Sequence, residues 1–362
     1  MTPLSRRKFF KFVAGGAVTI AALLLVTRDE PVASRETPRS LASRKPRPPM
    51  PTPTPTPSLS PISLGAYLHD AAFSKTQMAT WIAKVGTTPK VFQWFLDWGH
   101  YVNNPTVDYA GDGSFNTNYW DAAIAAAPGV APLMTWEPFN YAGSFPQATY
   151  SLANINAGHF DATINGMASN IAAWGKPLLV RLAHEMNGSW YPWGLGVNGN
   201  TAAQYITMWR KVVTAFRMAG ASNVRWVWCP NVDQATMAQF YPGDDYVDWI
   251  ALDGYNKGAV NGNTWITFQN MLISSYNQIC AITTKPLMIA ETASNETGGD
   301  KPQWIRDMFA MIPTAFPRIR AVIWYDYNAG GDYTEMAVDS TAASLSAFAA
   351  AMASPDNRAP MP

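Results

Sequence analysis

A short stretch near the middle of the chain combines a carboxyl group with hydrogen-bonding groups and aromatic rings. Residues 177–194 read Pro-Leu-Leu-Val-Arg-Leu-Ala-His-Glu-Met-Asn-Gly-Ser-Trp-Tyr-Pro-Trp-Gly. The apolar half is typical of a strand buried on both faces, and His184, Glu185 and Asn187 follow where that strand would end. Rings at 190, 191 and 193 indicate an exposed binding loop, so the stretch suits a sugar site. In the alternative interpretation, Glu185 caps a helix and the rings pack over the end of the fold.

A second carboxyl group, that of Glu291, ends another apolar run, Pro-Leu-Met-Ile-Ala-Glu. Cleavage of a glycosidic bond requires an acid that protonates the departing oxygen and a carboxylate that meets the positive charge developing on the sugar carbon. Glu185 and Glu291 would supply this minimum of two carboxyls, provided that the fold brings them together. The simpler alternative for Glu291 is capping of backbone amides at the end of its strand.

The elements that would position these residues repeat along the chain as apolar runs separated by stretches long enough for helices. Eight strands are expected, at 62–67, 91–98, 131–137, 177–185, 224–231, 249–255, 286–291 and 321–328. Helices are expected at 74–84, 117–127, 158–174, 202–219, 264–281 and 302–311, with a closing helix at 340–352. This order predicts an α/β fold, a (β/α)8 TIM barrel that forms a single catalytic domain over 62–362. Because the carboxyl ends of all strands face one mouth of such a barrel, both glutamates should meet there.

The motif Arg-x-x-His-Glu-Met-Asn-Gly-x-Trp-Tyr-x-Trp at 181–193 resembles the acid/base motif of glycoside hydrolase family 26. This is the β-mannanase family of a retaining clan with (β/α)8 barrels. The resemblance implies that Glu185 is the acid/base and Glu291 the nucleophile of a double displacement, with their carboxyls about 5–5.5 Å apart. Because two negative charges at that distance repel, we expect the pKa of Glu185 to be raised.

The same resemblance implies roles for residues around the two carboxyls. The expected substrate-binding set is Arg181, His184, Asn187, Trp190, Asp253, Tyr255, Trp324 and Glu137. Tyr255 would donate a hydrogen bond to the nucleophile, Trp190 would be a platform ring, and Trp324 would lie under the sugar at the cleavage point. Glu137 occurs in Thr-Trp-Glu-Pro, where β-mannanases typically carry a histidine, so it would either bind substrate or be a structural ion-pair partner.

These features predict an endo-acting β-glycanase with a polysaccharide substrate. The leading expectation is β-1,4-mannan, and mixed-linkage β-1,3-1,4-glucan is the alternative within the family, which also includes enzymes that cut β-1,3-xylan. A noncatalytic polysaccharide-binding barrel is an alternative of another class. The presence of both Glu185 and Glu291 argues against it, because a protein that only binds has no need of two acids.

The first part of the chain differs in composition from the rest. A basic segment with Arg6 and Arg7 precedes an apolar run over 13–26, which is the layout of an export signal of the twin-arginine type, expected over 1–34. Residues 35–61 form a Pro/Thr-rich linker, which repeated prolines keep extended. Fourteen apolar residues are too few for a comfortable membrane span, so an extracellular protein without a stable span after export is expected. In the alternative interpretation, the leader is not cleaved and tethers the protein to the membrane.

Composition excludes several other functions. With 362 residues and 48% hydrophobic content, the chain can bury a large core, and most of its 15 Trp are expected there. After residue 48 there are 16 basic and 22 acidic side chains, which excludes a basic nucleic-acid surface. Neither a metal nor another cofactor is expected, because the four His are scattered and His-Glu-Met-Asn-Gly lacks the second His of a zinc helix. The two Cys, 51 residues apart, are expected to be free and buried, and the protein to be a monomer.

Overall fold

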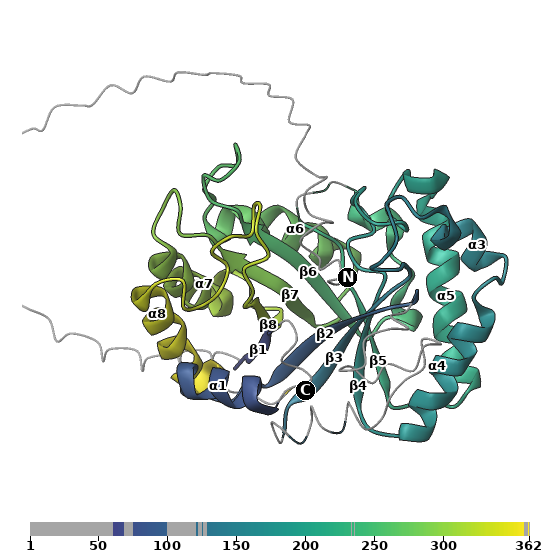
Figure 1. Cartoon of the computed structure of the whole chain (residues 1–362), viewed down its shortest axis with the longest axis horizontal. Helices are drawn as coiled ribbons and strands as arrows, with labels where there is room; N and C mark the ends of the chain where they lie inside the picture. Colours follow the sequence, from purple (N-terminus) through teal and green to yellow (C-terminus); the bar gives the residue numbers. More distant parts are fainter. Residues whose placement is uncertain are drawn as a thin grey trace, which may run out of the picture. The chain divides into compact units, whose positions relative to one another are not determined.

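The computed structural model describes residues 61–68, 75–99, 121, 125, 129–232, 234, 236–357 and 361. The predicted leader at 1–34 lies outside the described residues, as do all but the last residue of the predicted linker and most of the predicted helix at 117–127. The described residues contain every strand predicted from the sequence (Figure 1).

Eight strands form a closed barrel in which the spatial order is the order along the chain. They are β1 Ser63–Tyr67, β2 Val91–Asp97, β3 Ala131–Glu137, β4 Leu178–Leu182, β5 Val224–Trp228, β6 Trp249–Asn256, β7 Leu287–Ser294 and β8 Ile319–Tyr325. Each strand is parallel to the next, and β8 pairs with β1 to close the ring. The predicted (β/α)8 TIM barrel is therefore confirmed.

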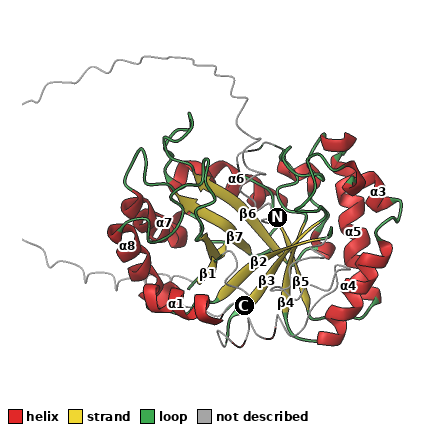
Figure 2. Ribbon diagram, viewed as in Figure 1, coloured by secondary structure: helices red, strands yellow, loops and turns green. Residues whose placement is uncertain are grey.

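Helices cover the outside of the barrel (Figure 2). They are α1 Lys75–Val85, α3 Leu152–Asn156, α4 Asp161–Trp174, α5 Ala202–Met218, α6 Phe268–Ile282, α7 Lys301–Ala315 and α8 Ala342–Ala353. Five of them begin just after a side chain that accepts a hydrogen bond from the first turn: Ser151 before α3, Thr201 before α5, Thr267 before α6, Asp300 before α7 and Thr341 before α8. These caps satisfy amides that have no partner within the helix, and they explain why α6 begins later than predicted.

The core has an outer layer between sheet and helices and an inner layer within the barrel. Large aromatic rings fill much of the outer layer; for example, Trp136 of β3 packs against Phe216 of α5. The inner layer contains a charged side chain, because Arg181 of β4 is fully buried. Of the two cysteines, which are both free, Cys229 is buried as predicted, but Cys280 on α6 is exposed, so the prediction for it was wrong.

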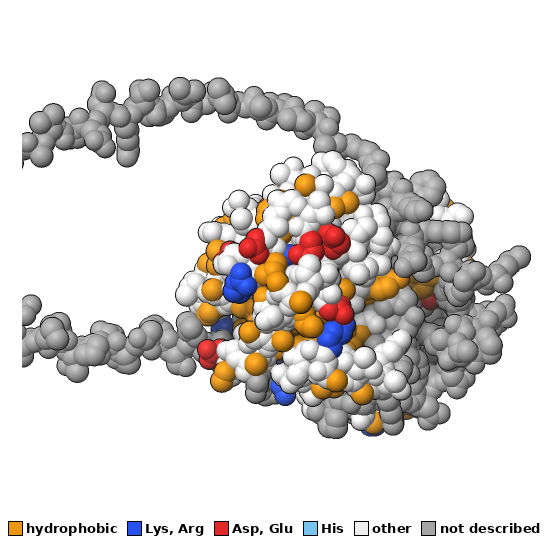
Figure 3. All heavy atoms as spheres, turned by 60° about the vertical axis from the view of Figure 1, so that its left-hand side comes forward, with side chains coloured by type: hydrophobic (Ala, Val, Ile, Leu, Met, Phe, Trp, Pro, Cys, Tyr) orange, Lys and Arg blue, Asp and Glu red, His pale blue; other side chains and the backbone are white. Residues whose placement is uncertain are grey.

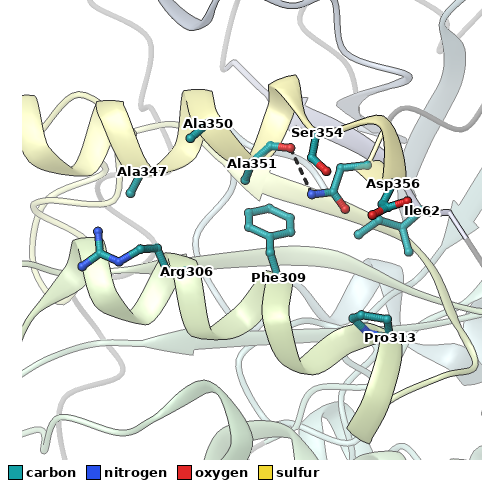
Figure 4. Close-up of a pocket in the computed structure, with 10 residues that line it drawn as sticks. Ile62, Arg306, Phe309, Pro313, Ala347, Ala350, Ala351, Ser354 and Asp356 are labelled. Carbon is teal, nitrogen blue, oxygen red and sulfur yellow. Dashed lines mark hydrogen bonds between the residues drawn. The ribbon is translucent and has the colours of Figure 1, made fainter. Parts of the chain in front are cut away.

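The outer surface has mixed character. On the face in Figure 3, small groups of acidic and basic side chains are separated by apolar ones. An apolar groove lies between α7 and α8, where Phe309 faces Ala347 and Ala351 (Figure 4). It extends to Ile62, just before β1, and so lies toward the end of the barrel opposite the predicted site. Within the described ranges, none of the helices combines the length and the apolar character needed to cross a membrane.

Candidate active site

The chain leaves β4 in a backbone conformation that residues other than glycine rarely adopt. Ala183 has a φ of 42° and Glu185 a φ of 53°, both in the left-handed region. The strand therefore ends at Leu182 rather than at 185 as predicted, because these angles break the extended repeat. The amide of Glu185 donates to the carbonyl of Cys229 over 2.7 Å, which fixes this turn against the end of β5. Backbone strain of this kind is concentrated at functional sites.

The carboxyl group of Glu185 lies between two hydrogen-bond donors and is almost fully buried. Asn231 Nδ2 donates to Oε1 over 2.8 Å, and Trp190 Nε1 donates to Oε2 over 2.6 Å. Burial and, next, the negative charge of Glu291 raise the pKa of Glu185 to about 7, although the two hydrogen bonds act in the opposite direction. Below neutral pH this carboxyl is therefore protonated and able to donate a proton, in the direction predicted.

Glu291 lies at an irregularity in the barrel. The register of β7 with β6 jumps between Leu252 and Asp253, which leaves Ala290 of β7 without a pairing residue. The register of β7 with β8 shifts over the same stretch. An extra residue of this kind bends the strand and redirects a side chain, and such bulges are frequent beside active sites.

Two hydrogen-bond donors contact the carboxyl of Glu291. Arg181 Nη2 donates to Oε1, and the Tyr255 hydroxyl donates to Oε2, as predicted for Tyr255. Burial, and then the charge of Glu291, raise the pKa of Tyr255 well above its ordinary value, so the phenol keeps its proton and remains a donor. Both carboxyl oxygens of Glu291 are thus held in place by donors, an arrangement that suits the nucleophile role implied by the family motif.

Arg181 is the centre of an ion-pair network inside the barrel. Its Nη1 lies 2.8 and 2.6 Å from the two oxygens of Asp253, and its Nε donates to Thr135 over 2.9 Å. Burial alone would lower the pKa of Arg181, but the charges of Asp253 and Glu291 raise it, so the guanidinium stays charged. Arg181 and Asp253 are both fully buried and form the ion-pair network beside Glu291, and their predicted contact with sugar stays a prediction.

His184 lies between the nucleophile and Glu137. Its Nε2 is 3.9 Å from Glu291 Oε1 and 3.1 Å from the Tyr191 hydroxyl, and its Nδ1 is 3.8 Å from Glu137 Oε1. Glu137 is fully buried and also accepts a hydrogen bond from the Tyr141 hydroxyl. Of its two predicted roles, the structure favours that of a structural partner over direct substrate binding. His184 is likewise fully buried and lies beside Glu291, and its predicted contact with sugar stays a prediction.

The comparisons with known proteins agree with this geometry. The sequence model of glycosyl hydrolase family 26 matches residues 79–332, which is more than half of the chain. The chain belongs to glycosyl hydrolase family 26. Endoglucanase H of Acetivibrio thermocellus is 35% identical over 250 residues, which are 67% of this chain and 26% of the relative. Mannan endo-1,4-beta-mannosidase of Bacillus subtilis is 26% identical over 271 residues, 66% of each chain. The match thus spans about a quarter of the first relative and less than two thirds of the second.

A solved structure supports the fold of this family 26 barrel. The catalytic domain of an endo-beta-1,4-mannanase from a Bacillus species superposes with a TM-score of 0.63 and 22% sequence identity. The superposition covers 83% of this chain and 87% of that domain. At this level of identity the likeness concerns the barrel alone.

Asn187 of the family motif has a different role from the one predicted. Its Nδ2 donates to the carbonyl of Asn231 over 2.8 Å, and its Oδ1 accepts from the amide of Asn231 over 2.9 Å. Both polar ends of this buried side chain are thus engaged with one neighbouring residue, which in turn holds the acid Glu185. Asn187 therefore positions Asn231 and, through it, Glu185, and its predicted contact with sugar stays a prediction.

Trp190, for which a platform role is predicted, lies beside Glu185. Its ring is partly exposed and lies beside Glu185, to which its Nε1 donates. Gly188 lies against the ring so closely that an added Cβ would be 2.4 Å from it. The glycine in the motif is therefore required by this close approach.

Trp324 does not lie at the mouth of the barrel, so the prediction that it lies under the sugar was wrong. Its side chain is fully buried, and its Nε1 donates to the carbonyl of Met336 over 2.9 Å. Its ring packs against Trp304 of α7 and Phe348 of α8, with ring centroids 6.1 and 5.3 Å away. The ring therefore belongs to the layer between β8 and the helices.

Trp324→Leu tests this correction. The substitution should lower the free energy of unfolding by about 2–4 kcal/mol, because it leaves a cavity between β8 and the helices and removes one hydrogen bond. The affinity for an oligosaccharide should not change. Urea unfolding and calorimetric titration measure the two quantities, and Trp190→Leu is the matched control, expected to weaken binding with little change in stability. Weaker binding by Trp324→Leu at unchanged stability would restore the original assignment.

One group of side chains has the composition of a metal site. His184, Asp253 and Glu291 offer ligand atoms that lie within 4.8 Å of one another. The guanidinium of Arg181 already contacts both carboxylates of this group, so the positive charge that a metal would bring is supplied by the protein. These residues therefore fit an internal ion-pair network better than a metal site.

Sequence reasoning missed several residues of the site. Asn231 orients the acid, Tyr191 contacts His184, and Tyr141 donates to Glu137. Asn231 was detectable as the polar residue that follows the fifth apolar run. Tyr141 had no such signal, because it reaches Glu137 from the loop after β3.

Proposed function

We propose that this protein is a secreted, retaining endo-β-glycanase with β-1,4-mannan as its leading substrate. The proposal rests on the contrast between its two buried carboxyls. The pKa of Glu185 is raised to about 7, whereas Glu291 accepts hydrogen bonds from Arg181 and Tyr255 that favour its anion. A proton donor and a carboxylate at one barrel mouth are the groups that hydrolysis with retention requires.

In the first step, a carboxylate oxygen of Glu291 attacks the anomeric carbon and forms an ester with the sugar. The bond to the departing oxygen breaks, and Glu185 transfers its proton to that oxygen. Asn231 and Trp190 hold the Glu185 carboxyl for this transfer. Arg181 and Tyr255 donate hydrogen bonds to the attacking carboxylate and hold it in position.

In the second step, water attacks the anomeric carbon, Glu185 takes a proton from that water, and the bond from Glu291 to the sugar breaks. The negative charge of Glu291, which helps to raise the pKa of Glu185, is absent while the ester exists. The pKa of Glu185 therefore falls after the first step. The same group is then a carboxylate, as a general base must be.

Mannan is proposed because Bacillus relatives are named for endo-1,4-β-mannosidase activity. A β-glucan is the second candidate, because the relative with 35% identity is named an endoglucanase and exceeds the Bacillus subtilis mannosidase in identity. Glu137 beside His184 also departs from the histidine that the family resemblance leads us to expect in β-mannanases.

The test is release of reducing sugar from mannan, glucomannan, barley β-glucan, lichenan and β-1,3-xylan by the full chain. We expect one polymer to be cut well above the others, and a Glu185→Gln/Glu291→Gln double variant to cut none. Oligosaccharide products early in the reaction would support endo action. If the wild type cuts nothing but is retarded by a polymer in affinity electrophoresis, the protein is a noncatalytic binding barrel.

Export is part of the proposal and depends on the basic segment with Arg6 and Arg7 followed by the apolar run over 13–26. Residues 35–61 would then serve as a stiff spacer in front of the catalytic barrel. Fractionation of expressing cells, with N-terminal sequencing of the exported protein, tests both the route and the position of cleavage.

A further inference from the structure

Tyr333, in the loop between β8 and α8, lies next to the residue that holds the nucleophile. Its ring centroid is 5.0 Å from that of Tyr255, and the two rings are nearly perpendicular, at 89°. Tyr255 in turn donates its hydroxyl hydrogen to Glu291. Tyr333 is partly exposed, so some of its surface faces outward beside the nucleophile. The sequence places Tyr333 after β8, but its ring contacts Tyr255 of β6, so the loop after β8 reaches the end of β6.

The backbone around Tyr333 is fixed by a tight turn and by one asparagine. The amide of Tyr333 donates to the carbonyl of Gly330 over 3.0 Å, and the reverse bond measures 3.2 Å. Asn295, after β7, donates to the carbonyl of Asp332 over 2.8 Å and accepts from the amide of Glu335 over 3.0 Å. These contacts fix the backbone just before Tyr333, at Asp332, and just after it, at Glu335.

Asn295 also connects the loop after β8 to the loop after β6. It donates to the carbonyl of Lys257, after β6, over 2.5 Å. The ammonium group of Lys257 lies 5.8 Å from the centroid of the Tyr333 ring, at the distance of a cation–π contact. Farther along the loop, the buried Lys301 donates to the carbonyl of Ala337 over 2.8 Å. The loop is thus pre-organised by polar contacts that a plain connection between a strand and a helix does not need.

We propose that Tyr333 is a specificity-determining residue that contacts the sugar ring attacked by Glu291. The proposal depends on the proposed function, because it takes Glu291 as the nucleophile. The faces of a pyranose ring carry C–H groups, and an aromatic ring buries this apolar surface while the hydroxyls at the rim remain free to bond. The departing sugar must instead lie near Glu185 and Trp190, because the acid has to reach its oxygen.

Binding to a catalytically inert enzyme tests the proposal. In full-length Glu291→Gln, calorimetric titration with mannohexaose and with a β-glucan hexasaccharide gives the dissociation constants. Adding Tyr333→Ala should weaken binding of the preferred oligosaccharide about tenfold, the size expected for loss of one buried ring. Adding Tyr333→Phe, which keeps the ring, should leave binding within about twofold.

Tyr246→Ala is the matched control. Tyr246 is also partly exposed and also lies against cations, with Arg210 and Arg217 5.1 and 5.2 Å from its ring centroid. It ends the short helix η7, Asp244–Tyr246, which precedes β6, so it lies toward the end of the barrel opposite the catalytic mouth. The same substitution there should not change binding.

Three outcomes would overturn the proposal. They are binding by Tyr333→Ala within twofold of the parent, an equal loss in Tyr246→Ala, and a parent that binds neither oligosaccharide. The titrations measure binding without turnover, so they test the role of Tyr333 independently of hydrolysis. A wild type that binds but hydrolyses nothing would refute the enzyme function, and the titrations would still decide whether Tyr333 contacts the sugar.

Discussion

Glu291→Ala should reduce kcat/KM on the polymer that the wild type cuts on the order of 10⁴-fold or more, because no other group forms the covalent bond to the sugar. The barrel should stay folded, because Arg181 keeps its contacts with Asp253 and Thr135. If circular dichroism shows near-normal secondary structure while activity is lost, the substitution impairs the catalytic step and not folding. Hydrolysis within tenfold of the wild type would exclude Glu291 as the nucleophile.

Azide distinguishes a lost nucleophile from a general loss of function. With an aryl β-glycoside that has a good leaving group, azide should enter the space vacated in Glu291→Ala and attack the anomeric carbon from that side. The phenolate departs, and the product is the glycosyl azide of inverted, α configuration. Glu291→Gln is the control, because it fills the space and should remain inactive with azide. A β-configured azide from Glu291→Ala would contradict the assignment.

Glu185→Ala should have a different pattern, in which the loss depends on the leaving group. Hydrolysis of the polymer should fall about 10²–10⁴-fold, because the departing oxygen needs a proton. A dinitrophenyl glycoside should still form the glycosyl-enzyme, because its leaving group departs without one. Azide should then attack this intermediate and yield the β-configured product. Equal losses with both substrates would show that Glu185 is not the acid.

The pH profile provides a second test of Glu185. Its raised pKa keeps the proton on the carboxyl below about pH 7, so wild-type kcat/KM should fall as the pH rises through about 7. Asn231→Ala should move this fall to higher pH, because the amide stabilises the charged form and its removal raises the pKa further. In Glu185→Ala the fall should be absent with the dinitrophenyl substrate. A fall that persists in Glu185→Ala would belong to another group.

The sequence predicted the architecture because the signals for a barrel are local. Each apolar run is long enough to be a strand covered on both faces, and the intervals between runs accommodate helices. The two catalytic carboxyls were predicted for a related reason: Glu185 and Glu291 directly follow or end such runs, and parallel strands all carry their carboxyl ends to one mouth. A specific motif then distinguished the two roles.

The direction of individual side chains was less predictable. In a strand, neighbouring side chains point to opposite faces, so a shift of one residue exchanges the inside of a barrel for its outside. Trp324 points toward the helices, whereas the next residue, Tyr325, stacks against Tyr67 of β1 with a centroid distance of 4.8 Å. The register shift between β7 and β8, which contributes to this placement, leaves no mark in the sequence.

The sequence by itself determined the barrel and the placement of two carboxyls at its mouth, because each follows from residue type and position along a strand. Only the tertiary structure decided which protein groups the other polar residues contact. Arg181, His184, Asn187, Asp253 and Glu137 look alike as candidates in the sequence, but in the fold all are buried and each has its own protein partners. Tyr333 could be recognised as a candidate only in the folded structure, where the loop after β8 contacts Lys257 after β6. Contacts between segments so far apart in the sequence depend on how the strands close into a ring.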